Sequence, residues 1–170
     1  VTNATHIYTV TIGSGSTFAL TVSVGNGWNM VSAPGTNPAG MGVTDWWSGK
    51  DPGAGVFKYA GGYVEVFTTT PSEGYWLKNS GAQVYNYPAI QIVPHNDVPL
   101  AQGWNLIGLY EVTEPTATLQ TQPSGIITTP IFEYSGGYTA ATNIEPGYGY
   151  WAKADQAGSI IGLSAPPLAK

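Results

Sequence analysis

The chain has 170 residues, of which 42% are hydrophobic, 12% aromatic and only 9% charged, with a formal net charge of −5. Five basic residues on an acidic chain do not make the basic surface that nucleic acid or anionic lipid requires. No apolar run approaches the roughly 18 residues of a membrane span, and the absence of cysteine excludes disulfides and thiolate metal sites. We expect a soluble, ordered protein that neither binds nucleic acid nor inserts into a membrane.

The N-terminal region, 1–21, is expected to be a strand or hairpin and could be the end of a preceding domain. Residues 6–12 alternate between apolar and polar side chains, a Gly-Ser turn follows at 13–16, and residues 17–24 alternate again. This pattern is typical of two antiparallel strands joined by a tight turn.

Short β-branched and aromatic runs, bounded by Gly, Pro or Asn, predict strands along the rest of the chain. With 23 Gly and 13 Pro interrupting every apolar period, helix is limited to a short turn around 42–48 or 116–121. The predicted fold class is therefore all-β. The expected strands are 28–32, 55–60, 63–68, 74–79, 82–87, 89–93, 104–110, 130–135, 137–141, 148–153 and 159–163.

Three motifs recur in the same order at an offset of 75 or 76 residues, so the chain is a tandem duplication. They are GWNMVSAP and GWNLIGLY from 27 and 103, VFKYAGGY and IFEYSGGY from 56 and 131, and PSEGYWLK and PGYGYWAK from 71 and 146. We place repeat 1 at 22–93 and repeat 2 at 98–163, joined by an ordered linker, with a Pro-rich C-terminal linker at 164–170.

A lone repeat of about 75 residues without cysteine would be only marginally stable. We therefore expect the repeats to pack as one sandwich-like or barrel-like body with pseudo-two-fold symmetry and a single interior. Lys58 is matched by Glu133 in the other repeat, and the two would pair if the halves meet near that turn. In the GYW strand, alternation places Tyr75 and Leu77 on one face and Trp76 on the other.

The aromatic residues that both repeats share are expected to pack in the core or between the repeats. Across each GGY turn, the two flanking tyrosines should meet side by side on neighbouring strands. The shared pairs are Trp28 and Trp104, Tyr59 and Tyr134, Tyr63 and Tyr138, and Trp76 and Trp151.

The aromatic residues found in only one repeat are the candidate ligand-binding residues. Trp46 and Trp47 adjoin in a polar, Gly-rich loop of repeat 1, and in an extended segment adjacent side chains point to opposite faces, so one should be exposed. Tyr85 and Tyr87 are specific to repeat 1, and Tyr148 to repeat 2. Exposed rings stack on the apolar faces of sugars, so we predict a polysaccharide or cell-surface glycan as ligand. The alternative is an aromatic loop that plugs the open end of the β core.

Catalytic and metal-binding patterns are weak. No acidic residue recurs in both repeats, no spacing suggests a hydrolytic carboxylate pair, and the two His are not at metal spacing. We expect no enzyme activity; a glycan-degrading enzyme is a weaker candidate. Calcium is the cofactor left open, with Asp45 and Asp51 as candidate ligands, and solvated loop acids are the alternative.

Residues 22–170 resemble a known family through the ordered GWN, GGY and GYW motifs and the segment AIQIVPH before the second GWN. The resemblance is to a duplicated module near the C-terminus of large secreted multidomain bacterial proteins, often after fibronectin-type domains and ahead of a sorting region. It implies secretion, attachment at the cell surface and neighbouring domains of a larger protein as partners. It implies no activity, and the join at NYPAIQIV is shorter than in relatives.

We predict a non-catalytic extracellular accessory module of a secreted or surface protein that binds polysaccharide. The alternative is a structural or adhesive spacer, or a subunit of an extracellular filament. In that alternative the segment 6–12 would complete the sheet of a neighbouring molecule by strand addition.

Overall fold

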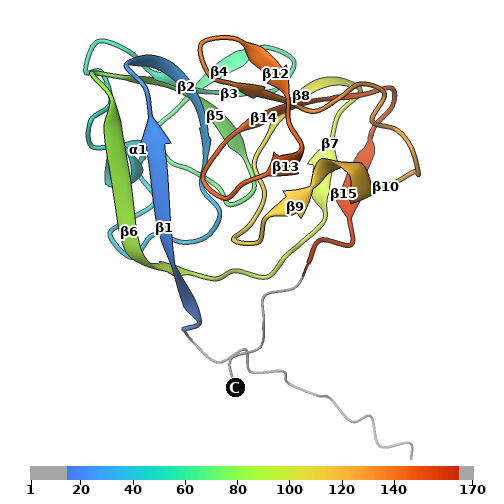
Figure 1. The fold of residues 1–170 in the computed structure, drawn as a ribbon, viewed down its shortest axis with the longest axis horizontal. Coiled ribbons are helices and arrows are strands. Elements are labelled where there is room, and N and C mark those ends of the chain that lie inside the picture. The colour runs from blue at the N-terminus through green and yellow to red at the C-terminus, as the bar shows by residue number, and fades with distance from the viewer. Residues whose placement is uncertain (1–14, 165–170) are drawn as a thin grey trace, which may run out of the picture.

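The computed structural model describes residues 15–164, which fold into two β-rich halves lying side by side (Figure 1). The all-β prediction is confirmed, and within these residues the sheets are open and antiparallel, so the expected body is sandwich-like and not a barrel. The segment 6–12, with the predicted hairpin and the strand-addition alternative, lies outside the described residues. The longest helix between residues 15 and 164 is too short to cross a membrane.

Each repeat is built on a four-stranded antiparallel sheet, and the strand order is the same in both. In repeat 1 the order is β2 (Gly27–Ser32), β5 (Gly74–Asn79), β3 (Val56–Tyr59) and β4 (Tyr63–Val66). In repeat 2 it is β8 (Gly103–Ile107), β14 (Tyr150–Ala154), β11 (Phe132–Tyr134) and β12 (Tyr138–Ala140). The sequence duplication is therefore also a structural duplication.

A second strand pair accompanies each large sheet. In repeat 1, β1 (Thr17–Val24) pairs with β6 (Gln83–Gln91), and in repeat 2, β7 (Val98–Leu100) pairs with β15 (Gly158–Ile161). The two strand pairs have the same register. Val22 is paired with Tyr85 in repeat 1, and the equivalent residues of repeat 2, Val98 and Ile160, are paired with each other. The strand β1 thus belongs to repeat 1, and the expected boundary between 21 and 22 falls inside it.

The remaining elements are short. Both predicted helical turns occur, as α1 (Val43–Trp46) and η1 (Thr116–Thr118). The strands expected at 82–87 and 89–93 are the single strand β6. The prediction missed four strands of two or three residues, which are too short to show an alternating pattern: β7, β9 (Glu114–Pro115), β10 (Gln120–Gln122) and β13 (Asn143–Ile144).

The interior consists of three hydrophobic clusters, which corrects the expectation of a single one. Each repeat has its own core, and in β5 the side chains of Tyr75 and Leu77 point into that of repeat 1. The third cluster joins the two large sheets through Met30, Trp76, Leu106 and Trp151. The predicted alternation in the GYW strand is confirmed, because Trp76 points away from Tyr75 and packs against the other repeat.

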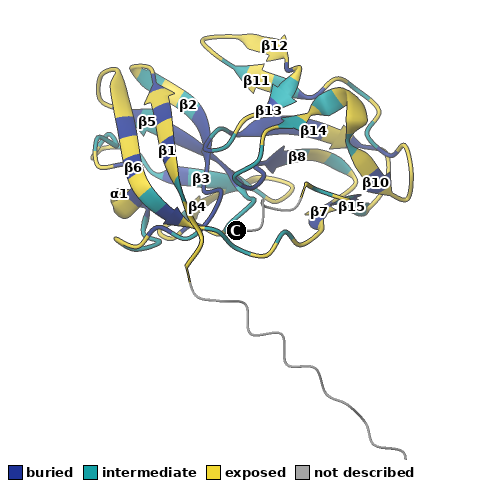
Figure 2. Ribbon diagram, turned by 60° about the horizontal axis from the view of Figure 1, so that its bottom comes forward, coloured by how far each residue is buried: buried dark blue, intermediate teal, exposed yellow. Residues whose placement is uncertain are grey.

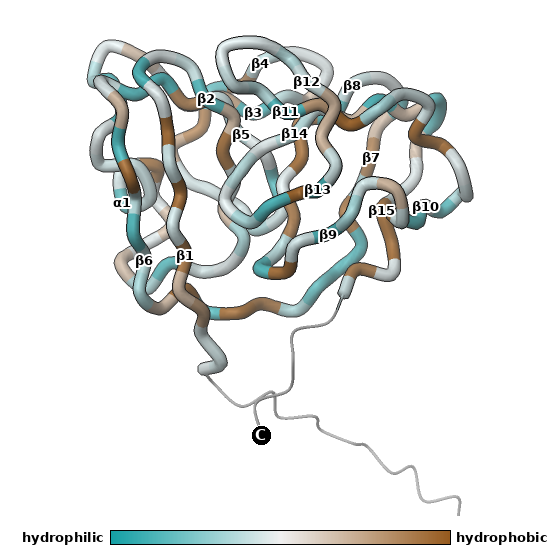
Figure 3. Tube along the Cα trace, viewed as in Figure 1, coloured by the Kyte–Doolittle hydropathy of each residue, from teal (hydrophilic) through white to brown (hydrophobic). Residues whose placement is uncertain are grey.

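Alternation also shapes the outer strands. Buried and exposed residues succeed one another along β1 and β6 (Figure 2). Hydrophobic residues are spaced along strands such as β1, β7 and β15 (Figure 3). Each of these strands therefore covers its core with one face and leaves the other polar.

The backbones of the two repeats are joined at equivalent places. Val31 of repeat 1 forms a β-bridge with Tyr148 of repeat 2, and Ile107 of repeat 2 forms the corresponding bridge with Glu73. Val31 and Ile107 are equivalent residues of the two repeats, and so are Glu73 and Tyr148. Each repeat therefore makes the same bridge to the other, as a pseudo-two-fold axis requires. The approach is close enough that a Cβ on Gly149 would lie 2.9 Å from the Val31 carbonyl oxygen, so glycine is required there.

Candidate functional site

Trp46 and Trp47 lie in the core of repeat 1, each only 1% exposed, so the prediction that one of the two indoles is exposed is wrong. The segment is not extended: α1 ends at Trp46, and Trp47 follows with φ −128° and ψ 77°. This turn directs both indoles inward, where Trp46 lies 5.1 Å from Tyr87 and Trp47 lies 5.9 Å from Tyr75, measured between ring centroids. The alternative, an aromatic loop that closes the β core, describes them correctly.

Tyr85 and Tyr87, also predicted to contact a ligand, are buried in the core of repeat 1. The Tyr85 hydroxyl donates to Asn79 Oδ1 at 2.6 Å and accepts from the Gly49 amide at 3.0 Å, while the Tyr87 hydroxyl donates to the Trp46 carbonyl. Burial raises the pKa of both hydroxyls above the ordinary value. The two tyrosines fasten the α1 loop to β6.

Tyr148 differs from the other predicted ligand residues because it is only half-buried. Its hydroxyl accepts a hydrogen bond from the Ser23 amide at 3.0 Å, which ties repeat 2 to β1 of repeat 1. It also lines a surface groove beside Trp28. Of the five predicted ligand residues, Tyr148 is the only one that is not buried.

The two calcium candidates stabilise their own loops. Asp45 Oδ2 accepts from the Gly42 amide at 2.9 Å, and Asp51 Oδ1 accepts from the Gly53 amide at 2.8 Å. Asp51 Oδ2 lies 3.0 Å from Lys78 Nζ. The Gly53 N–H and the Lys78 ammonium hold the pKa of Asp51 below its usual value. Between residues 15 and 164 no three His, Asp or Glu side chains gather at a metal-binding distance.

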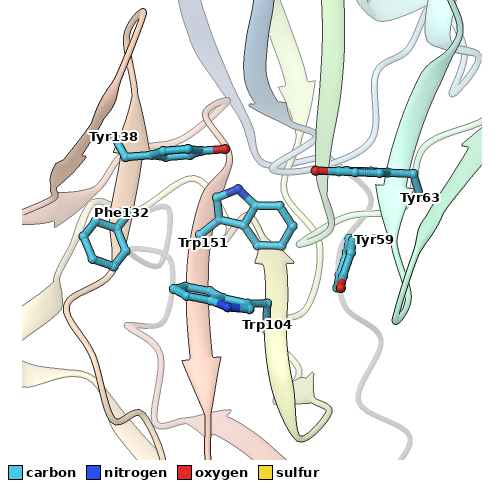
Figure 4. A pocket seen from close by; sticks show the side chains of 6 residues that line it. All are labelled: Tyr59, Tyr63, Trp104, Phe132, Tyr138 and Trp151. Atoms are coloured by element: carbon cyan, nitrogen blue, oxygen red, sulfur yellow. The ribbon is translucent and has the colours of Figure 1, made fainter.

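Several of the shared aromatic residues are exposed, contrary to the expectation that they are core. Trp104 is 40% exposed, Tyr63 61% and Tyr138 56%. They belong to a groove of about 430 Å³ between the two large sheets, which we call the aromatic groove (Figure 4). Its lining consists of six aromatic side chains from both repeats: Tyr59, Tyr63, Trp104, Phe132, Tyr138 and Trp151.

Trp151 forms the centre of the aromatic groove. Tyr59 packs edge-on against it with ring centroids 5.0 Å apart, and Trp104 does so at 6.1 Å. Tyr63 and Tyr138 extend over it from opposite sides with their hydroxyls directed toward each other (Figure 4). Burial and the neighbouring Tyr138 raise the pKa of Tyr63.

The two GGY hairpins position this tyrosine pair. Gly61 and Gly136 have φ values of 75° and 72°, a left-handed conformation that glycine adopts without steric cost. The turn brings Tyr63 opposite Tyr59, with ring centroids 5.5 Å apart, as the sequence predicts. Both hairpins therefore present a second tyrosine just after an exposed tip.

The predicted pairing of Lys58 with Glu133 does not form. Lys58 Nζ lies 3.3 Å from Glu73 Oε1 in its own repeat, and Glu133 accepts a hydrogen bond from Thr139. The reason is alternation along β3: Tyr59 points at the other repeat, so its neighbour Lys58 points away. The hairpins meet through their tyrosines and not through their charges.

One signal could have indicated the aromatic groove. Recurrence of a residue in both repeats predicts burial, but residues next to a hairpin tip are exposed in most folds. Tyr63 and Tyr138 each follow a Gly-Gly tip directly. The recurrence of a residue in both repeats shows that both repeats need it, but it does not show that its side chain is buried.

No protein-family model matches the chain, and no curated protein or solved structure does either. The resemblance to the duplicated GWN, GGY and GYW module therefore stays a prediction.

Proposed function

We propose that the chain is a non-catalytic binding module that holds a polysaccharide in the aromatic groove. The observation that carries the proposal is a groove of about 430 Å³ lined by six aromatic side chains, among them the exposed rings of Trp104, Tyr63 and Tyr138. Exposed aromatic surface of this extent is uncommon on a monomer unless it binds something. The groove volume also lies in the range of known ligand pockets.

The chemistry of the lining suits sugars. Flat aromatic faces pack on the C–H faces of a sugar ring, while tyrosine hydroxyls and indole N–H groups hydrogen bond to sugar hydroxyls. Tyr63 and Tyr138 direct their hydroxyls over the Trp151 ring, so stacking and hydrogen-bonding groups converge on one space (Figure 4). This combination supports a glycan ligand better than a purely hydrocarbon one.

Charge narrows the class of glycan. The lining of the aromatic groove contains no carboxylate, and the chain carries a net charge of −5. An acidic chain repels polyanions such as sulfated or uronic-acid polymers. Neutral or cationic polysaccharides are therefore the proposed ligands.

The extracellular setting is a separate part of the proposal. It rests on the low content of charged residues and on the resemblance to modules of large secreted proteins. In that setting the chain would anchor a larger surface protein to a glycan, with its neighbouring domains as further partners.

The test is a panel of neutral, cationic and anionic polysaccharides in affinity electrophoresis and titration calorimetry. Trp104→Ala should weaken binding about tenfold, the value of one well-placed aromatic contact. The matched control is Phe67→Ala, which removes a ring that is 74% exposed but lies outside the groove. The proposal fails if no polysaccharide binds, or if both variants bind as the unchanged protein does.

The assembly alternative is favoured by a different surface. Val64 lies on β4, an edge strand, and is 45% exposed, and the strongly exposed Phe67 follows shortly after it. Edge strands with exposed apolar residues are prone to pair with other chains. Sedimentation would show concentration-dependent association that is lost in the double variant Val64→Thr, Phe67→Ser.

A further inference from the structure

The tryptophan of the first GWN motif also borders a groove, although that groove is not the symmetry equivalent of the aromatic groove. Trp28 corresponds to Trp104 and is similarly exposed, at 43%. It borders a groove of about 440 Å³, which we call the Trp28 groove. The turn between β1 and β2 forms one side, and the other side comes from repeat 2 through Glu133, Tyr134 and Glu145.

The two tryptophans differ in what covers them. In repeat 2, Lys153 lies opposite Trp104 on the neighbouring strand, and its Nζ lies 5.6 Å from the centroid of the indole ring. In repeat 1, Lys78 lies opposite Trp28 in the same register, but its Nζ is 3.0 Å from Asp51 Oδ2. From residue 15 to residue 164, no ammonium group lies over Trp28.

The Trp28 groove also carries negative charge. Glu133 and Glu145 line it, and Glu133 occupies the position that Lys58 has in repeat 1. Thr139 and Thr113 each donate a hydrogen bond to one of these carboxylates, but in the described part of the chain neither carboxylate is paired with a lysine.

Both carboxylates act on the same hydroxyl. Burial, with the charges of Glu133 and Glu145, raises the pKa of Tyr150 to about 12, although the Glu145 amide that donates to this hydroxyl opposes the shift. Tyr150 lines the groove together with Glu133 and Glu145, so the groove contains a region of negative charge. A cation bound there would meet an aromatic face on one side and negative charge on the other.

We propose that the Trp28 groove is a second subsite that binds an ammonium group of the ligand, which makes the ligand a polysaccharide with free amino groups. The inference rests on the proposed function, because it takes the ligand to be a glycan. The ligand ammonium lies in the groove that Trp28 and the two carboxylates line together. Glu133 and Glu145 offset its charge.

The experiment compares oligomers of glucosamine with N-acetylglucosamine oligomers of equal length by titration calorimetry. Acetylation removes the positive charge and keeps the sugar ring. We expect the glucosamine oligomers to bind about five- to tenfold more tightly, the range of a cation–π contact assisted by carboxylates. High salt should reduce this preference, because it screens the charges.

Charge variants test whether the preference arises in the Trp28 groove. Glu133→Gln with Glu145→Gln should remove most of the preference and leave the binding of the acetylated oligomer unchanged. The matched control is Glu65→Gln, which removes an exposed carboxylate that does not line the groove. This control should keep the full preference.

A further variant uses the lysine of the chain itself. Asp51→Asn removes the charge that holds Lys78, so Lys78 should move over Trp28 as Lys153 lies over Trp104, and its positive charge should oppose the binding of the ligand ammonium. The preference for glucosamine should then fall, and Lys78→Gln added to Asp51→Asn should restore it. The Trp28 indole N–H signal in NMR spectra, assigned with Trp28→Phe, should shift in Asp51→Asn.

The outcomes separate this inference from the proposed function. Equal binding of both oligomers, with no effect of the Glu133 and Glu145 changes, overturns the ammonium subsite, while a loss in Trp104→Ala would still support the aromatic groove. If neither oligomer binds but another polysaccharide does, the amino-glycan inference is wrong and the proposed function stands. If no polysaccharide binds, both are wrong.

Discussion

Tyr59 of repeat 1 packs edge-on against Trp151 of repeat 2, with ring centroids 5.0 Å apart and an interplanar angle of 80°. The pseudo-two-fold axis repeats this contact as Tyr134 against Trp76, at 5.0 Å and 74°. These two contacts flank the cluster that joins the large sheets. Of these two pairs, Tyr59 and Trp151 also line the aromatic groove.

The coupling between Tyr59 and Trp151 can be measured in a double-mutant cycle. Tyr59→Leu and Trp151→Leu should each lower the free energy of unfolding, and the edge-on contact should appear as a coupling energy of about 1 kcal/mol. Urea denaturation followed by circular dichroism gives the four values needed. Strictly additive effects would show that the repeats are not held together by this pair.

Burial separates the two kinds of tryptophan. Trp46→Ala should cost about 3–5 kcal/mol, because it empties a fully enclosed site in the repeat 1 core. Trp104→Ala should cost less than about 2 kcal/mol, since water already reaches the ring. Thermal unfolding midpoints should therefore fall strongly in the first variant and little in the second. The reverse order would contradict the burial of the α1 loop.

Gly149 tests the close contact between the repeats. A Cβ at this position would lie 2.9 Å from the Val31 carbonyl oxygen, so Gly149→Ala should force the backbones apart and destabilise the protein by about 1–3 kcal/mol. Gly62→Ala is the matched control, because a Cβ there meets no atom within 4 Å. Equal denaturation midpoints for the two variants would argue against the inter-repeat bridge at Val31 and Tyr148.

Alkaline pH should unfold the protein through its buried tyrosines. Burial raises the pKa of Tyr150 from 10.0 to about 12 and shifts Tyr75, Tyr85 and Tyr87 in the same direction. The folded state keeps these protons where the unfolded state loses them, so the stabilisation is complete below pH 10 and is lost as the pH rises toward 12 and above.

Urea denaturation across this pH range gives the measurement. Each tyrosine that holds its proton only in the folded state should steepen the fall by about 1.4 kcal/mol per pH unit. Tyr138→Phe, which changes an exposed tyrosine, should leave the slope unaltered. Unchanged stability up to pH 12 would mean that these hydroxyls are not enclosed as described.

The sequence by itself determined the repeat, the all-β class and the local geometry. An offset of 75 or 76 residues identified the duplication, and strand alternation placed Tyr75 and Trp76 on opposite faces. The Gly-Gly turn brought Tyr59 opposite Tyr63. These features depend on residues close together in the chain, so their spacing is enough to predict them.

Only the tertiary structure decided which aromatic rings are covered. Trp46 and Trp47 are buried because a helical turn directs both of them inward, and Trp104 is exposed because it lies at the rim of the interface between the sheets. Alternation along a strand assigns a side chain to a face, but whether that face is covered depends on how distant segments pack. For that reason the sequence placed the candidate site on buried rings and missed the groove formed by the shared ones.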